Sequence, residues 1–292
     1  MTFDPNAQLD PSSVTDARGG GGRMGGRGGL AVGGGGLGLV VTIIYLLLGG
    51  NPGALVGDGS GSGSGPDVNG PNSSALASCQ TGADANQRED CQIVGYVNSI
   101  ESYWSGALQG YEKAETVLFS GNVSTGCGGA TSATGPFYCP ADKNVYIDLT
   151  FFQELEDRFG AKDAPFARAY VLAHEYGHHV QDLVGALQPG GNDTGPTSRS
   201  VRTELQADCY AGVWANHAQS TGYIKALTAE QIAAADAAAS AVGDDHIQQS
   251  SGGGVDPDSF SHGTSEQRVR WFTTGYESGK PDDCDTFNAT NL

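Results

Sequence analysis

The sequence predicts a predominantly helical α+β domain with a small β-sheet, preceded by one transmembrane helix. Three observations predict this arrangement. A run of 19 residues near the N-terminus is apolar and carries no charge. The composition then changes sharply near residue 80, from Gly-rich sequence to sequence with regular apolar periodicity. Beyond that point several segments repeat at helical spacing, whereas one phrase alternates as a strand does.

The first 48 residues contain two predicted segments. Residues 1–29 carry three acids and three arginines among many glycines, and so few apolar side chains predict a disordered cytoplasmic segment. Residues 30–48, "LAVGGGGLGLVVTIIYLLL", match the roughly 20 positions that a helix needs to cross a bilayer. A cleaved signal peptide and a flexible Gly-rich segment remain alternatives, because the four glycines at 33–36 weaken hydrophobicity and helix propensity.

The basic residues around this run predict its orientation. Arg18, Arg23 and Arg27 precede it, and no Lys or Arg follows it until Arg88. The positive-inside rule therefore predicts a single-pass protein of the cell membrane, with a cytoplasmic N-terminus and an extracytoplasmic domain. Residues 49–78, rich in Gly and Ser, predict a flexible linker that spans about 30 Å. The domain proper is then expected over residues 79–292.

All six cysteines lie beyond the apolar run, which indicates an oxidising compartment. Six cysteines permit about 15 connectivities. Proximity in the sequence favours the pairs Cys79–Cys91, Cys127–Cys139 and Cys209–Cys284. The last pair would clamp the C-terminal segment beside the helix that carries Asp208.

The formal net charge is −18. The charges of residues 1–50 cancel, so this excess belongs to the predicted outer part. A surface of that sign repels nucleic acid and anionic lipid, and no nucleic-acid partner is expected.

The elements of the domain follow from periodicity and capping residues. Apolar residues at helical spacing predict a helix over about 87–113, and alternation in "NVYIDLTF" predicts a strand around 144–150. Helices are also expected over about 163–187, after Asp163 as N-cap, and over about 200–219. Capping boxes begin two more helices, and they pair Thr228 with Gln231 and Thr264 with Gln267.

The stretch "VLAHEYGHHVQD" carries the strongest chemical motif. His174 and His178 are four positions apart, so in a helix both imidazoles leave one face and can bind a single Zn²⁺ ion. Glu175 follows the first of them, where a carboxylate can take a proton from a water molecule on the metal. This is the HExxH pattern.

A zinc site of this type needs a third protein ligand. Glu204 in "RTELQADCYAGVWA" is the candidate, and Asp208 follows one turn later on the same helix face. This spacing predicts Glu204 on the metal and Asp208 as acceptor of an imidazole N–H, that of His174. The alternative is an ordinary solvated carboxylate pair.

These motifs together resemble a known family. HExxH followed by ExxxD resembles the gluzincin arrangement of thermolysin-type peptidases. "GPFYCPADKNVYIDLTFF", "AHEYGHHVQ", "RTELQADCYAGVWA" and "SHGTSEQRVRWFTTGYESG" are similar to the bacterial neutral zinc metallopeptidase family. The resemblance covers most of residues 79–284. It implies a zincin-like metallopeptidase domain, an N-terminal membrane anchor and a peptide or protein substrate.

The same resemblance implies a mechanism. Water activated by zinc would hydrolyse the peptide bond, with Glu175 as general base and then as proton donor to the leaving amine. The strand "NVYIDLTF" resembles the edge strand with which such peptidases pair an extended substrate.

Stabilising the oxyanion needs a further group. His262 is our candidate for this catalytic role, and a capping or buried structural histidine is the alternative reading. Tyr146, Tyr276 and Arg268 are rival candidates.

Two other functions remain open. A non-catalytic extracytoplasmic module could use zinc only to staple two helices for binding or assembly, although such a site needs no Glu175. A zinc hydrolase could instead act on cell-wall cross-links or another amide.

Overall fold

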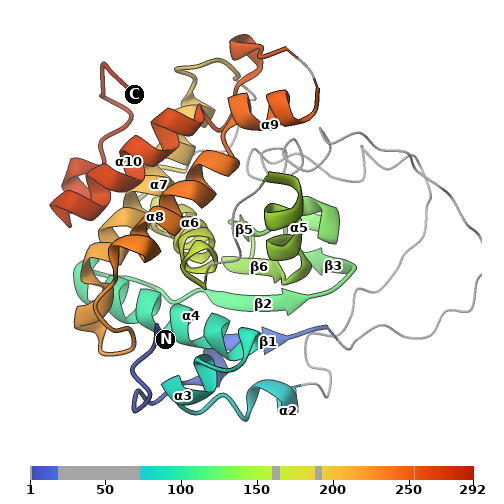
Figure 1. The fold of residues 1–292 in the computed structure, drawn as a ribbon, viewed down its shortest axis with the longest axis vertical. Coiled ribbons are helices and arrows are strands. Elements are labelled where there is room, and N and C mark those ends of the chain that lie inside the picture. Colours follow the sequence, from blue (N-terminus) through green and yellow to red (C-terminus); the bar gives the residue numbers. More distant parts are fainter. Residues whose placement is uncertain (1, 19–72, 160–164, 188–192, 253) are drawn as a thin grey trace, which may run out of the picture.

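The computed structural model describes residues 2–18, 73–159, 165–187, 193–252 and 254–292. Figure 1 shows a mixed sheet with a stack of helices on one side, in which α6, α7, α8 and α10 lie against one another. The α+β class, mostly helical with a small sheet, is confirmed.

Most of the described elements are helices. They are α2 (Ser73–Leu76), α3 (Gly82–Ala85), α4 (Glu89–Ala107), α5 (Thr150–Phe159), α6 (Pro165–Leu183), α7 (Arg199–His217), α8 (Ala229–Ala241), α9 (Asp244–Ser250) and α10 (Ser265–Ser278). The capping boxes at Thr228 and Thr264 are present as predicted. Helix α4 ends before its predicted limit, because the chain turns extended at Leu108.

The strands form two sheets. They are β1 (Val14–Asp16), β2 (Glu115–Phe119), β3 (Asn122–Thr125), β4 (Gly128–Thr131), β5 (Phe137–Cys139) and β6 (Asn144–Asp148). The larger sheet has the order β1-β2-β6-β5, in which β1, β2 and β6 are parallel and β5 is antiparallel to β6. Strands β3 and β4 form a separate antiparallel pair.

The expected edge strand is wrong. Strand β6 lies between β2 and β5, and β5 pairs with its residues Asn144–Tyr146, so β6 is not an edge strand of the sheet. Alternation of side chains tells which face of a strand is buried, but it does not tell how many neighbours the strand has.

Helices α6 and α7 lie in the middle of the core. Almost every residue of α6 from Phe166 to Gln181 is buried, and α7 is buried from Glu204 to Ala215. Helices α4 and α8 pack on α6, and α10 packs on α7. Polar side chains on α6 and α7 are therefore removed from bulk solvent and must find partners within the protein.

Two glycines set the approach of α10 to α7. A Cβ atom on Gly212 would lie 2.0 Å from the carbonyl oxygen of Phe272, and one on Gly275 would lie 2.0 Å from that of Cys209. Neither helix backbone can retreat without breaking other contacts. The close crossing therefore requires glycine at both positions.

The three predicted disulfides are present: Cys79–Cys91, Cys127–Cys139 and Cys209–Cys284. Disulfide bonds of this number are characteristic of proteins outside the reducing cytosol.

The expected disorder of residues 1–29 is wrong for residues 2–18. Strand β1 pairs with β2, and Phe3, Leu9 and Val14 are buried in the main core. Few apolar side chains are enough to order this segment, because the rest of the domain supplies an apolar surface and the backbone groups of β2. The folded domain therefore includes residues 2–18 together with α2, in addition to the predicted 79–292.

The predicted transmembrane helix, residues 30–48, and most of the linker lie outside the described residues. Within the parts of the chain that the structure describes, no helix has the length and hydropathy needed to span a membrane.

Candidate metal centre

The structure brings His174 and His178 of α6 together with Glu204 of α7. The two Nε2 atoms lie 3.1 Å apart. The Glu204 carboxylate oxygens lie 3.2 Å from Nε2 of His174 and 3.4 Å from Nε2 of His178. All three side chains are buried. Two imidazole nitrogens and one carboxylate oxygen around a common point match the donor set that zinc prefers.

Asp208 holds the His174 ring from behind. Its Oδ1 atom lies 2.8 Å from Nδ1 of His174, the contact that the sequence predicts. The carboxylate is fully buried and also binds Arg268 of α10 through two bonds, 2.8 Å from Nε and 2.9 Å from Nη2. The Tyr170 hydroxyl donates to the same Oδ1 atom at 2.5 Å. Asp208, Arg268 and Tyr170 thus fix the orientation of the His174 ring.

The His178 ring is held by neutral amides instead. Its Nδ1 atom lies 2.8 Å from Oε1 of Gln181. The Gln181 amide donates to the carbonyl of Thr203 at 2.8 Å and to Oε1 of Gln206 at 3.1 Å. The Gln206 amide then donates to the carbonyl of Cys284 at 2.9 Å. The chain of bonds ends at the Cys209–Cys284 disulfide.

The pKa values of these groups follow from burial and charge. Burial would lower the pKa of His174, but the charge and hydrogen bond of Asp208 raise it to about 10. Burial lowers the pKa of His178 to about 4. Burial would raise the pKa of Glu204, yet the imidazoles hold it well below its usual range. The carboxylate is therefore the anionic member of the set and His178 is the neutral one.

Glu175 lies next to these three residues, and one of its carboxylate oxygens has no hydrogen-bond partner. Its Oε2 atom is buried and accepts no hydrogen bond. Burial raises the pKa of Glu175 to about 7, against the opposing charge of His174 and a backbone hydrogen bond from Tyr138. A carboxylate that changes protonation near neutral pH is suited to proton transfer.

His262 precedes α10 and is held by Asp244, the first residue of α9. Its Nδ1 atom lies 3.1 Å from Oδ1 of Asp244. The backbone N–H groups of Ser261, His262 and Gly263 all donate to Oδ2 of Asp244, at 2.7, 2.7 and 2.9 Å. This loop is therefore fixed around one carboxylate, and the His262 ring lines the same cleft as Glu204.

A cleft is lined by His174, Glu175, Glu204, His262 and Arg268. Its volume is about 690 Å³ with its opening included. Tyr170 and Thr134 complete its polar lining, and its remaining walls are largely apolar. These walls are formed by Pro136, Phe151, Val171, Val242 and Ile247.

The rival oxyanion candidates have other partners. The Arg268 guanidinium lines the cleft but is engaged by Asp208. The Tyr146 hydroxyl donates to Asp142, 2.8 Å away, and the Tyr276 ring stacks on Phe272. Neither tyrosine lines the cleft.

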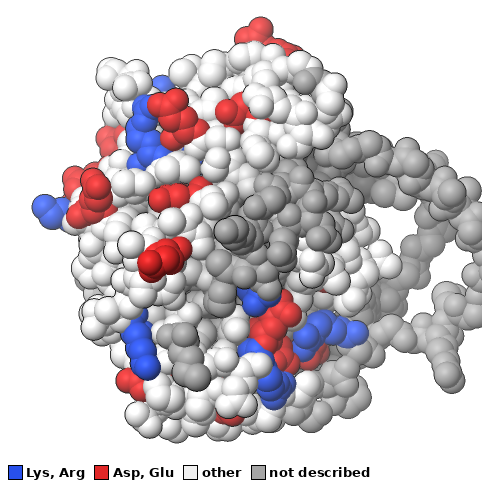
Figure 2. Space-filling model, viewed as in Figure 1, with Lys and Arg blue, Asp and Glu red and all other residues white. Residues whose placement is uncertain are grey.

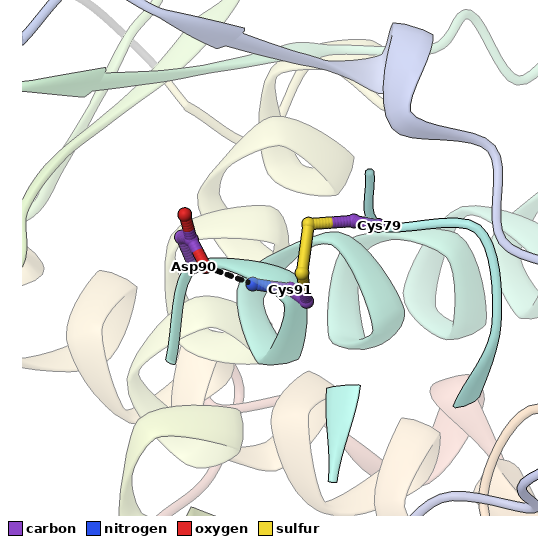
Figure 3. Close-up of side chains that lie close together, drawn as sticks. All are labelled: Cys79, Asp90 and Cys91. Atoms are coloured by element: carbon purple, nitrogen blue, oxygen red, sulfur yellow. Dashed lines mark hydrogen bonds between the residues drawn. A yellow bond between two sulfur atoms is a disulfide. The ribbon is translucent and has the colours of Figure 1, made fainter. Parts of the chain in front are cut away.

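A second group of metal-binding residue types, Cys79, Asp90 and Cys91, offers no such site. Figure 3 shows that the two sulfur atoms are joined in a disulfide, and the Asp90 carboxylate turns back to the N–H of Cys91 at 2.9 Å. Sulfur in a disulfide is not the thiolate that binds metal.

The sequence reading missed Tyr170, Gln181 and Asp244. Tyr170 and Gln181 stand four residues before His174 and three after His178, which places them on the ligand face of α6. That spacing is a signal which was available. Asp244 follows a glycine at a short helix, and no motif connects it with His262.

Comparison with known sequences agrees with this geometry. The family described as "Putative neutral zinc metallopeptidase" matches residues 6–287, and the chain belongs to this family. The uncharacterized protein Rv2575 of Mycobacterium tuberculosis is 51% identical over 227 residues, which are 74% of this chain and 77% of that protein. The uncharacterized protein YpfJ of Escherichia coli K12 is 48% identical over 183 residues, 61% of this chain and 62% of that protein. No solved structure matches the chain with statistical significance.

Proposed function

We propose that the domain is a zinc-dependent peptidase of zincin-like architecture, with Zn²⁺ held by His174, His178 and Glu204. The observation that carries this proposal is the convergence of two imidazoles and one buried carboxylate beside Glu175, at the wall of a cleft. A site that only joins two helices has no need for an adjacent buried carboxylate or for an opening. Membership of the zinc metallopeptidase family supports the same function.

The donor chemistry fits zinc. The two imidazoles and the carboxylate are near enough for one ion, and each has a partner behind it or an opposite charge beside it. When bound, zinc would supply Lewis acidity to the scissile carbonyl and to water.

Glu175 performs the proton transfers in this proposal. Its place at the cleft wall beside the ligands allows it to accept a proton and to release it to the leaving amine. Burial keeps bulk solvent from competing for that proton. The unpartnered Oε2 atom is the oxygen available for the transfer.

His262 is proposed to stabilise the oxyanion. Asp244 fixes the ring and its backbone, so the donor is positioned before the substrate arrives. A preorganised donor of this kind contributes about 3–4 kcal/mol to transition-state stability. His262→Ala is expected to lower kcat about 10²–10³-fold with zinc content unchanged, and full activity in this variant would remove His262 from the mechanism.

The substrate in this proposal is a peptide or protein with an apolar residue near the cleaved bond. Phe151, Val171, Val242 and Ile247 offer apolar contacts, and the described lining has no charged side chain other than those of the site and Arg268. Hydrolysis of a cell-wall cross-link or another amide is the alternative substrate class.

The proposed location is extracytoplasmic. Three disulfides support an oxidising compartment. Attachment to the membrane by residues 30–48 remains a prediction from the sequence.

The deciding experiment compares zinc stoichiometry and hydrolysis of a broad peptide library in the wild type and in Glu175→Gln. Loss of the general base should lower hydrolysis about 10²–10⁴-fold while zinc stays bound. Glu277→Gln, an exposed position on α10, is the matched control and should retain activity. Bound zinc without hydrolysis in any form would favour the non-catalytic module that uses zinc for binding or assembly.

A further inference from the structure

The N-terminal segment, residues 2–18, is bound to the domain along its whole length by backbone hydrogen bonds. Strand β1 adds a parallel strand to β2, with Val14 opposite Thr116 and Asp16 opposite Leu118. Earlier in the segment, Leu9 donates to the carbonyl of Gln80 at 2.9 Å. The N-terminal end pairs with the loop after α7, where the Asp4 N–H donates to the carbonyl of Tyr223 at 3.0 Å. Both termini of the segment are thus anchored.

Two asparagines of the domain bind the segment as a neighbouring strand would. Oδ1 of Asn86 accepts the N–H of Phe3 at 3.1 Å, and its Nδ2 donates to the Phe3 carbonyl at 3.0 Å. Asn98 on α4 repeats this with Asp10, at 2.7 and 3.0 Å. An Asn side chain both donates and accepts, so one amide satisfies both polar groups of a backbone residue. These two side chains form a receptor for this segment.

The receptor also has a pocket of matching shape for Phe3. The Phe3 ring is 1% exposed, and its centroid lies 4.7 Å from that of Tyr96. A Cβ atom on Gly95 would lie 2.4 Å from the Phe3 ring, so the absence of a side chain at Gly95 provides the space. Burial of this ring adds an apolar contribution to the hydrogen bonds.

The last residue of the segment is tied to α4 by charge. The Arg18 guanidinium pairs with Asp16 at 2.7 Å and reaches Asp90 at 3.5 Å. Figure 2 shows acidic and basic side chains gathered over the region of β1 and α2. Arg18 is one of the three arginines from which the sequence predicts a cytoplasmic N-terminus.

The receptor itself depends on a disulfide. Gln80, which accepts from Leu9, directly follows Cys79, and Cys79 is bonded to Cys91 at the start of α4, the helix of Asn98. Figure 3 shows this bond joining the loop to the helix. The surface that receives the segment is therefore completed where disulfides form.

We infer that residues 2–18 lie in the same extracytoplasmic compartment as the disulfide-bonded domain and fold with it as one unit. Strand pairing and burial of Phe3 require direct contact, which a bilayer of about 30 Å would prevent. A cytoplasmic N-terminus with an outer domain is incompatible with this packing.

The test uses cysteine labelling of the full chain in spheroplasts of the producing bacterium. Gln8→Cys and Gln219→Cys each place a thiol at an exposed position, one in the segment and one in the domain. The described native cysteines are paired, so the parent chain gives the background. A membrane-impermeant maleimide should label both variants equally before lysis.

Two outcomes would overturn the inference. Labelling of Gln219→Cys before lysis, with Gln8→Cys labelled only afterwards, would place the segment across the membrane. Labelling of both only after lysis would place the whole unit inside the cell.

A second measurement tests the docking in the purified full chain by hydrogen exchange of the peptide that spans residues 2–18. Gly95→Ala should displace Phe3 and speed this exchange at least about tenfold, because local opening becomes easier. Gly106→Ala on the same helix is the matched control, since a Cβ atom there meets nothing within 4 Å. Exchange at the free-peptide rate in the wild type, or unchanged protection in Gly95→Ala, would contradict the docking.

Discussion

The two imidazoles of the candidate metal centre are held in different ways. The His174 ring is bound by a charged group, Asp208. The same carboxylate accepts hydrogen bonds from Arg268 and from the Tyr170 hydroxyl. His178 is backed by neutral amides, in which Gln181 binds the ring and is itself bound by Gln206 and by the backbone.

The two arrangements differ in the free-energy cost of removing one partner by substitution. A buried carboxylate and a buried guanidinium compensate each other, so removing either one leaves an uncompensated charge. A buried amide that loses a partner leaves one unmade hydrogen bond, which costs less. Changes on the His174 side should therefore affect both stability and metal affinity strongly, and changes on the His178 side more weakly.

The largest effect is expected for Asp208→Asn. Zinc affinity should fall about 10–100-fold, since the ring of His174 loses its anionic acceptor. The domain should also lose about 3–5 kcal/mol of stability, because Arg268 keeps its charge without a partner. Chelator competition and urea unfolding measure the two effects.

A double variant separates these effects. Asp208→Asn with Arg268→Gln removes the unpaired charge and should regain much of the stability but not the zinc affinity. If Asp208→Asn alone retained wild-type affinity and stability, charge would not be what holds His174.

Glu101 on α4 offers a buried carboxylate without a cation. It accepts the N–H of Ala114 at 3.0 Å and forms no ion pair with a described residue. Burial raises its pKa to about 7, so between about pH 4.5 and 7 the folded state keeps a proton that the unfolded state has released. Stability should fall through that window by up to about 3 kcal/mol and stay level above it.

Glu101→Gln should remove this pH dependence and be more stable than the wild type at pH 8. Urea unfolding at pH 5 and pH 8 provides the test. An equal change in both proteins between these pH values would show that Glu101 titrates normally.

Gln181→Met probes the amide side directly. The change keeps the volume but leaves Nδ1 of His178 and the carbonyl of Thr203 without this partner, at a cost of about 1–3 kcal/mol. Zinc affinity should fall by about tenfold or less. If Gln181→Met lost as much zinc affinity as Asp208→Asn, the amide contacts would be as important for metal binding as the charged ones.

The smallest effect on zinc affinity is expected from the disulfides. Cys209→Ser with Cys284→Ser frees the segment whose carbonyl binds Gln206, so affinity should fall less than about tenfold. The pair Cys127→Ser with Cys139→Ser is the control and should leave affinity unchanged. An equal fall in both pairs would indicate general destabilisation instead.

The sequence predicted the parts that depend on local spacing. The HExxH and ExxxD patterns fixed which residues of α6 and α7 share a face, and capping boxes fixed where α8 and α10 begin. The disulfide pairs followed from proximity. Spacing within single helices, together with the HExxH and ExxxD motifs, therefore predicted the candidate ligands and the Asp208 contact.

The parts that depend on distant partners were not predicted. The pairing of β1 with β2 joins residues about a hundred positions apart, and the central place of β6 depends on both neighbours. Arg268 is a rival oxyanion candidate in the sequence, where its counter-charge cannot be recognised. Its partner Asp208 is on another helix, 60 positions away.

The crossing at Gly212 and Gly275 has a consequence for any attempt to redesign the proposed site. A methyl group at either glycine would push α10 away from α7. The Arg268 guanidinium would then lose its bonds to the Asp208 carboxylate, which orients the His174 ring. Substitutions at these two positions, which lie outside the cleft lining, could therefore change the geometry of the proposed site. Gly212 and Gly275 thus help to orient the His174 ring because they have no side chain.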